Sequence, residues 1–203
     1  MLSNFGNFLI IGSIFFTLLI IYIAFQKIKE KSFQIGKNLV YLSIFQITFI
    51  ISSFLLLVFA FIFSDFSLLG VYQNSHTSKP IFYKIAGVWG NHEGSLLLWI
   101  NVMVIFSYLF FVFNNRFNKS YSLYTLLTQN TLIFGFLIFL VSNSNPFFKI
   151  IPVPLEGLGL NPILQDPALA IHPPILYLGY VGSSIIFSSS LAAMVSNYVS
   201  KDW

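Results

Sequence analysis

Residues 156–182 read EGLGLNPILQDPALAIHPPILYLGYVG and pass from a loop rich in Gly, Pro and Asn into an apolar helix. Proline removes a backbone donor and clashes with the preceding turn, so a helix tolerates it best in the first turn, where N–H groups have no intrahelical partner. The Pro173–Pro174 pair therefore predicts that the helix begins at about these residues, with His172 at its mouth. The positive end of the helix dipole disfavours a protonated imidazole there, and a metal ligand must be neutral. From spacing alone, an ordinary loop histidine is the commoner interpretation.

The composition indicates a membrane protein. The chain is 57% hydrophobic and only 8% charged, whereas soluble domains carry about 25% charged residues. Five apolar stretches are long enough to cross a bilayer, and none contains Asp, Glu, Lys, Arg or His. These predicted spans lie at about 5–25, 39–63, 95–113, 123–141 and 175–195. We therefore expect a single all-α integral membrane domain over residues 1–203 with five transmembrane helices.

Positive charge sets the predicted topology, because loops rich in Lys and Arg stay on the inner side. Seven of the ten such residues then fall on inner loops and the tail: Lys27, Lys29, Lys31, Lys37, Arg116, Lys119 and Lys201. The N-terminus is predicted outside and the C-terminus inside. Two long, ordered outer loops, 64–94 and 142–174, carry all three histidines, His76, His92 and His172. The groups capable of chemistry thus gather on the outer side.

Three further features of the sequence bear on the function and the location. The chain has no cysteine, so it has no disulfide framework and no Cys-x-x-Cys-His for covalent haem attachment. The first apolar stretch lacks a positive n-region and a small-residue cleavage site, so it is predicted to be a retained span. The abundance of Phe, Ile, Asn and Lys suits an AT-rich genome and favours organellar encoding, although an AT-rich bacterium would look the same.

A second informative stretch, GVWGNHEGSLLLW, occupies residues 87–99. Trp89 and Trp99 suit the membrane interface, where an amphipathic ring settles. His92 and Glu93 stand at the start of the third span, where such a pair could orient a ligand or shuttle a proton. The alternative is that Glu93 caps the helix N-terminus, favoured by its dipole. The residues alone favour the cap.

The segments GVWGNHEGSLLLW and LNPILQDPALAIHPPILYLGYVG resemble the two early signatures of the CcmF family, in the family's order. That family is the integral-membrane subunit of the cytochrome c haem lyase in System I cytochrome c maturation. The resemblance implies that His172 is an outer axial ligand of haem iron, with Pro173 and Pro174 supporting it. Asp166 and Tyr180 lie near His172 in the sequence and could support it by hydrogen bonding, or could equally be ordinary interface residues. The haem or partner surface would include Trp89, His92, Glu93 and Trp99.

Several parts of the family pattern are absent from this sequence. Members of the CcmF family are similar in having a tryptophan-rich outer segment of the type WGxxWxWD, a second outer axial His, and two His within spans that bind a b-type haem. None of these occurs here. The resemblance therefore implies a split lyase whose remaining fragments are separate polypeptides, or a degenerate remnant with a structural role. Because both signatures are intact, the split, organelle-encoded form is favoured.

The expected function is the N-terminal subunit of a cytochrome c haem lyase, which helps to hold haem at the outer membrane surface for attachment to apocytochrome c. Haem would be shared with the remaining CcmF fragments, and a haem chaperone, apocytochrome c or a thiol-reducing partner would act with them. The chain is not expected to be active alone, to supply a catalytic residue or to bind nucleic acid.

The expected location is the mitochondrial inner membrane, with the histidine-bearing loops in the intermembrane space, or a bacterial plasma membrane. One alternative function is a non-catalytic structural subunit of a respiratory or assembly complex. A transporter subunit is disfavoured, because intramembrane ionisable residues mark ion pathways and these spans contain none.

Overall fold

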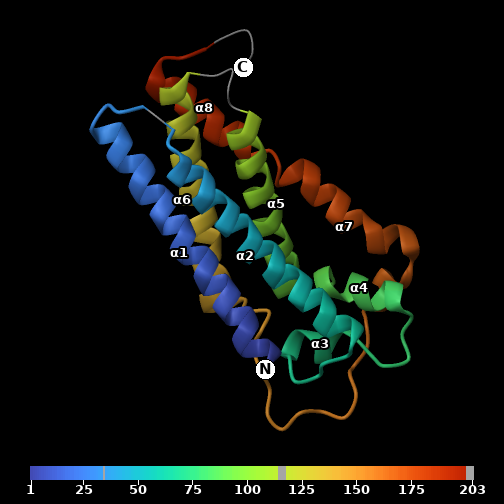
Figure 1. Ribbon diagram of the computed structural model, residues 1–203. Helices are drawn as coiled ribbons and strands as arrows, with labels where there is room; N and C mark the ends of the chain where they lie inside the picture. The colour runs from blue at the N-terminus through green and yellow to red at the C-terminus, as the bar shows by residue number, and fades with distance from the viewer. Residues whose placement is uncertain (34, 114–117, 200–203) are drawn as a thin grey trace.

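The computed structural model describes residues 1–33, 35–113 and 118–199, and its regular elements over these residues are helices (Figure 1). The membrane-spanning segments are α1 (Leu2–Lys29), α2 (Lys37–Ile62), α5 (His92–Phe113), α6 (Lys119–Asn143), and α7 (Pro167–Tyr180) with α8 (Ser184–Ser196). Five segments of the described chain are long and apolar enough to cross a bilayer. The all-α prediction with five spans is confirmed.

Both predicted outer loops contain helices of their own. The first holds α3 (Leu69–Asn74) and α4 (Ile81–Trp89), and the second holds the 3₁₀-helix η2 (Pro162–Gln165) and the first half of α7. These elements lie at the same end of the bundle as the N-terminus (Figure 1). We call this the capped end. It is where the two signature segments come together.

The charges separate between the two ends as the sequence predicts. The turn from α1 to α2 and the start of α6 hold Lys27, Lys29, Lys31, Lys37 and Lys119, away from the capped end. Lys79, Lys84 and Lys149 belong to the capped end, whereas Arg116 and Lys201 lie outside the described residues. This separation suits the positive-inside rule. The outward-facing N-terminus itself stays a prediction.

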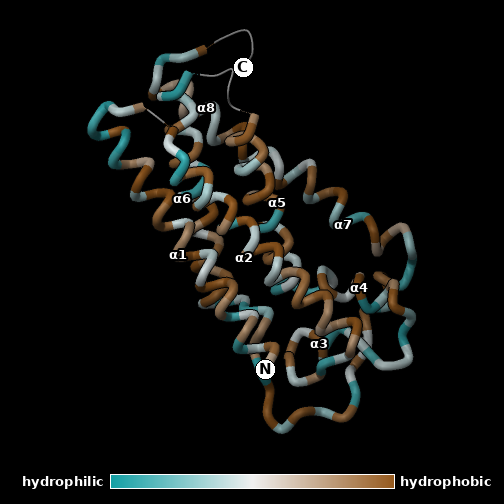
Figure 2. The backbone as a smooth tube through the Cα atoms, in the orientation of Figure 1, coloured by the Kyte–Doolittle hydropathy of each residue, from teal (hydrophilic) through white to brown (hydrophobic). Residues whose placement is uncertain are grey.

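Helix α1 buries most of a small-residue stripe, together with a few aliphatic side chains, and exposes most of its aromatic ones. Its buried face includes Gly6, Ser13 and Thr17, whereas Phe8 and Phe15 are more than half exposed. A Cβ at Gly6 would lie only 2.3 Å from the Phe147 ring, so glycine allows this close approach. Between helices in lipid, packing of small residues takes over from hydrophobic burial. Figure 2 shows the matching hydropathy, with hydrophobic residues along the spans.

A buried polar network joins three spans inside the bundle. The side-chain amide of Gln46 in α2 donates to Thr17 Oγ1 in α1 and to Asn130 Oδ1 in α6, each at 2.8 Å. A polar side chain inside a span is expected to hydrogen-bond across helices, and Gln46 does so. The same rule predicts an interhelical bond for Thr48, the other main polar group of this span, but Thr48 donates to Ile44 O within its own helix. It lies on the exposed side of α2.

The fifth span begins earlier than predicted. Helix α7 starts at Pro167, and the Asp166 side chain caps it by accepting from the backbone N–H groups of Ala168 and Leu169 at 2.9 and 3.1 Å. Pro173 and Pro174 consequently lie inside α7 rather than in its first turn. The predicted start near residue 175 and the placement of His172 at the helix mouth are both wrong. A proline at the first position and an Asp cap provide a complete N-terminus upstream.

The fifth span is also broken in the middle, at residues 181–183 between α7 and α8. Gly182 packs against Phe106 of α5, and an added Cβ would lie 2.3 Å from the Leu178 carbonyl oxygen. Beyond the break, Gln129 of α6 donates to Ser184 and accepts from Ser188, at 2.9 and 2.7 Å. Helix α8 is therefore fixed to the bundle, whereas α7 leans away from it (Figure 1).

Candidate functional site

The two signature segments meet at Trp89 and α7. The Trp89 indole Nε1 donates to the Ala170 carbonyl oxygen at 2.8 Å. In a regular helix the N–H of residue 174 would bond this carbonyl, but proline has no N–H. Trp89 thus supplies the donor that Pro174 lacks. This hydrogen bond satisfies the acceptor that Pro174 leaves free and so helps α7 to continue past Pro174.

A second contact lies two turns further along α7, where Tyr177 meets Ser95 near the start of α5. Ser95 Oγ of α5 donates to the Trp89 carbonyl oxygen at 2.7 Å and lies 3.2 Å from the Tyr177 hydroxyl of α7. Because a serine hydroxyl has one proton, Tyr177 is the donor in the second bond. The Trp99 ring meets Tyr177 edge-on with ring centroids 5.5 Å apart. These contacts hold the inward face of α7 against α5.

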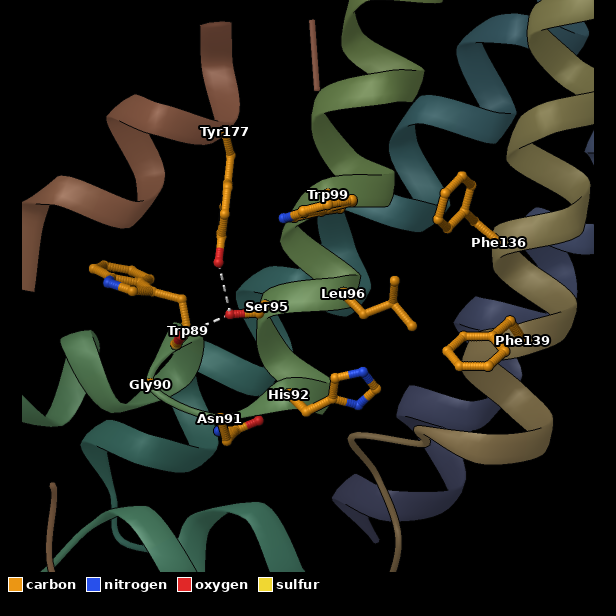
Figure 3. Close-up of a pocket in the computed structure, with 10 residues that line it drawn as sticks. All are labelled: Trp89, Gly90, Asn91, His92, Ser95, Leu96, Trp99, Phe136, Phe139 and Tyr177. Atoms are coloured by element: carbon orange, nitrogen blue, oxygen red, sulfur yellow. Dashed lines mark hydrogen bonds between the residues drawn. The ribbon is translucent and has the colours of Figure 1, made fainter. Parts of the chain in front are cut away.

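A cavity of about 510 Å³ opens beside these contacts, between α5, α6 and α7 (Figure 3). It is lined by Trp89, Gly90, Asn91, His92, Ser95, Leu96, Trp99, Phe136, Phe139 and Tyr177. His92 lies at its lower edge in Figure 3, with Nδ1 2.9 Å from Ser144 Oγ and its ring edge-on to Phe139. The walls are therefore mainly aromatic, with the histidine at the start of α5.

His92 and Glu93 do not act as a pair. Glu93 lines a different groove, of about 380 Å³, formed mainly by α3, the end of α6 and the segment that follows it. Nor does Glu93 accept a backbone hydrogen bond at the start of α5. That role belongs to Asn91, whose Oδ1 accepts from Gly94 N at 2.7 Å. Asn is among the preferred N-cap residues, so the sequence alone could have identified Asn91 as the cap. The prediction of Glu93, which rested on its negative charge, is wrong.

His172 lies on the opposite face of α7 from the cavity. The inward stripe is Ala170, Pro173, Pro174 and Tyr177, which are buried or half-buried, at the i, i+3, i+4, i+7 spacing of one helix face. At about 100° per residue, His172 points away from that stripe. It is exposed and makes no hydrogen bond within the described part of the chain. The structure therefore separates His172 from Trp89, His92 and Trp99 by the thickness of α7.

Neither Asp166 nor Tyr180 hydrogen-bonds His172 within the described residues. The Asp166 carboxylate is engaged by the first turn of α7. Tyr180 is 68% exposed, and its ring meets Trp99 at 6.1 Å. No contact in the described residues supports the predicted role of Asp166 and Tyr180 in orienting His172. Instead, Asp166 caps the start of α7, and Tyr180 extends the aromatic contact between α7 and α5.

Comparison with known proteins places the chain among proteins of cytochrome c biogenesis. The family model described as cytochrome C assembly protein matches residues 89–202, more than half of the chain. The chain belongs to the cytochrome c assembly protein family. The cytochrome c-type biogenesis protein CycK of Bradyrhizobium diazoefficiens is 47% identical over 158 residues, which is 78% of this chain and 24% of that protein. CcmF of Escherichia coli is 43% identical over 145 residues, 71% of this chain and 22% of that protein.

A solved structure entitled cytochrome c heme lyase CcmF has the same fold, with a TM-score of 0.81 over 97% of this chain and 31% of the other. Its sequence identity of 22% supports the fold alone. The resemblance to the N-terminal part of the CcmF family is confirmed. This family member spans about a quarter of the length of the curated relatives it matches.

A carboxylate clamp joins the two loop regions at the capped end of this family member. Glu156 accepts hydrogen bonds from the Thr77 hydroxyl and backbone N–H and from Gly157 N. The Thr77 hydroxyl, followed by the Gly157 and Thr77 backbone N–H groups, lowers the pKa of Glu156 from 4.5 to about 2. His76 Nδ1 lies 3.9 Å away and adds a small attraction. The clamp ties the loop before α4 to the segment that leads into α7.

The described residues contain no cluster of three or more His, Asp or Glu that could hold a metal ion. A haem iron needs only axial ligands, and His172 could supply one of them. The site could therefore bind and orient such a group, with any further ligand supplied by residues from elsewhere.

Proposed function

We propose that this chain is the N-terminal subunit of a cytochrome c haem lyase, helping to hold haem at the outer membrane surface for covalent attachment to apocytochrome c. The observation that carries the proposal is the position of His172. Its imidazole stands exposed on the outward face of α7, with no hydrogen bond in the described chain to occupy it. Imidazole is a common axial ligand of haem iron.

The surroundings of His172 suit a flat apolar molecule. Exposed residues of the same face are Ala168, Ile175, Leu176 and Gly179. Ala168 and Gly179 are small, and a Cβ added at Gly179 would meet nothing within 4 Å. Ile175 and Leu176 offer apolar contact beside the ring. A porphyrin could lie along this strip with its iron at His172, so the residues fit the group.

Within this proposal haem is the substrate, and the chain contributes position rather than a reacting group. Covalent attachment adds the two thiols of apocytochrome c to the haem vinyl groups, and this chain has no cysteine to compete for them. Holding one reactant in a fixed orientation lowers the entropic barrier to that addition. The hydrogen bond from Trp89 and the contacts of Tyr177 brace α7 from behind, which keeps the His172 face in place.

The proposed partners are those that would complete a haem lyase. In this proposal His172 supplies one axial ligand, and the second comes from a polypeptide carrying the tryptophan-rich segment and another outer histidine. A haem chaperone would deliver the substrate, and apocytochrome c with a thiol-reducing partner would receive it. We place the capped end in the intermembrane space of a mitochondrion, or in the periplasm of a bacterium, as the lysine distribution favours. The relatives named above are bacterial, which supports the second location.

The test is native co-purification from detergent-solubilised membranes, followed by mass spectrometry and haem absorbance. We expect a co-purifying polypeptide with a tryptophan-rich segment, and at least about tenfold weaker haem retention in His172→Ala, since disturbing even an outer-shell partner of a metal site costs that much. His76→Ala is the matched control, because it removes an exposed histidine elsewhere at the capped end. Equal haem retention in the two variants, or recovery only with respiratory-complex subunits, would overturn the proposal.

The alternative of a non-catalytic membrane subunit has one observation in its favour. The outward face of α7 is apolar and uncovered, with Ile175 at 64% and Leu176 at 49% exposure, as a docking helix would be. Under this alternative, Ile175→Asn would weaken assembly while His172→Ala would change neither assembly nor haem content.

A further inference from the structure

The cavity behind α7 has an unusual balance of hydrogen-bonding groups. Asn91 donates to the carbonyls of Gly87 and Val88 and accepts from Gly94. The Trp89 indole is bonded to Ala170, while Ser95 and Tyr177 bond each other. These polar side chains of the lining are therefore already satisfied within the protein.

Two ring nitrogens of the lining have no hydrogen-bond partner among the described residues, Nε2 of His92 and Nε1 of Trp99. The Trp99 nitrogen can only donate. The Ser144 hydroxyl has no other acceptor in the described chain, and with its proton directed at His92 Nδ1 the imidazole carries its own proton on Nε2. Both nitrogens are then donors, so an occupant must bring acceptors.

The rest of the lining is apolar and reaches the lipid-facing surface. Leu96, Phe136 and Phe139 form this part of the wall, and Phe139 is 45% exposed on the outside of α6. Figure 3 shows both phenylalanine rings projecting from α6 toward α5. His92 is the first residue of α5 and so lies near the end of a span, at the depth of the membrane interface, whereas Trp99 lies about two turns deeper. The volume of about 510 Å³ lies within the roughly 300–1,000 Å³ typical of ligand pockets.

We propose that this cavity binds one membrane phospholipid. Its ester and phosphate oxygens accept hydrogen bonds from His92 Nε2 and Trp99 Nε1, and the first part of an acyl chain packs on Leu96, Phe136 and Phe139. Phospholipid ester and phosphodiester oxygens are acceptors only, which matches a lining whose free groups are donors. The lipid would fill the space between α6 and α7 and so support α7 from the side that its protein contacts leave open. The site is separate from the His172 face and does not depend on the proposed function.

Native mass spectrometry of the full chain tests this proposal. The protein is released in a mild detergent from nanodiscs of phosphatidylethanolamine and phosphatidylglycerol, and the phospholipid retained per chain is counted. We expect one retained lipid in the wild-type chain. Trp99→Phe keeps an aromatic ring beside Tyr177 but removes a donor, and His92→Phe removes the other. The double variant should reduce retention by about tenfold, as two lost hydrogen bonds predict.

The control is Tyr22→Phe, which removes a hydroxyl from an aromatic residue that is 59% exposed on the lipid-facing side of α1. Its retention should match the wild-type chain. Trp99→Phe alone, a milder change, should give a partial loss and guards against misfolding of the double variant. No retained lipid in the wild-type chain would overturn the proposal. So would equal loss in Tyr22→Phe, unchanged retention in both Trp99→Phe and the double variant, or haem in place of lipid.

Discussion

The indole of Trp89 donates to the carbonyl oxygen of Ala170, the acceptor that Pro174 leaves without its helical partner. The two residues are 81 positions apart in the chain. Ala170 is fully buried, so its carbonyl could not turn to water if the indole were removed. This relationship makes Trp89 part of the backbone hydrogen bonding of α7.

Trp89→Phe should therefore destabilise the packing of α7. An unsatisfied buried acceptor costs about 1–3 kcal/mol, and we expect a loss of that size in thermal unfolding in detergent, with faster hydrogen exchange in α7. Pro174→Ala restores a backbone N–H that can bond Ala170. The double variant Trp89→Phe with Pro174→Ala should recover much of the loss, and additive destabilisation would contradict the assignment.

Gln46→Leu should weaken the association of α1, α2 and α6. The substitution removes the bonds to Thr17 and Asn130 and leaves Asn130 Oδ1 buried without a donor. Interhelical hydrogen bonds in membranes average about 0.6 kcal/mol, so two predict a loss of about 1 kcal/mol or more in denaturant unfolding. Thr48→Val is the matched control, because its hydroxyl bonds only within α2, and a similar loss there would show that the network is unimportant.

Gly94→Ala should prevent the tight junction between α4 and α5. A Cβ at this position would lie 1.6 Å from the Val88 carbonyl oxygen, and backbone atoms cannot move aside as a flexible side chain can. We expect strongly reduced recovery of folded protein from membranes, measured by size-exclusion chromatography in detergent. Gly135→Ala on α6 meets nothing within 4 Å and should be neutral or slightly stabilising. Normal recovery of Gly94→Ala would mean that the junction is more adaptable than its geometry indicates.

The Glu156 clamp should open in acid. Hydrogen bonds from Thr77 and Gly157 lower the pKa of Glu156 from 4.5 to about 2, so its contribution to stability is present above pH 4.5 and is lost as pH falls toward 2. Limited pepsin digestion should cut the wild-type chain near residues 144–166 increasingly over this range, relative to Glu156→Gln at the same pH. If the ratio of cleavage rates stayed constant between pH 4.5 and 2, the carboxylate would not control the clamp.

Some features of this protein are local enough to follow from sequence. The five spans depend on runs of apolar residues, whose burial in lipid needs no particular neighbour. The interhelical role of Gln46 was predictable for a similar reason, since an amide inside a span must find a partner. The same argument gave the wrong answer for Thr48, because a threonine hydroxyl can bond its own helix.

The start of α7 is a feature that local sequence rules predicted incorrectly. The rule that prolines belong in the first turn counts the N–H groups that a helix loses, and it placed the N-terminus at Pro173. That rule does not include a hydrogen-bond donor supplied by a distant segment of the chain. Asp166 and Pro167 offered an equally good start upstream. The choice between the two starts depended on Trp89, which only the folded chain brings to Ala170.

The sequence by itself determined that the chain is a membrane protein with five spans, that most of its positive charges lie on one side of the spans, and that two segments of the CcmF type are present. These properties reside in composition and short motifs. Only the tertiary structure decided that Trp89, Ser95 and Tyr177 meet behind α7, that His172 faces the other way, and that His92 borders a separate cavity. The physical reason is that the facing of a helix is set by what packs against it, and here those partners lie more than 80 residues away in the chain.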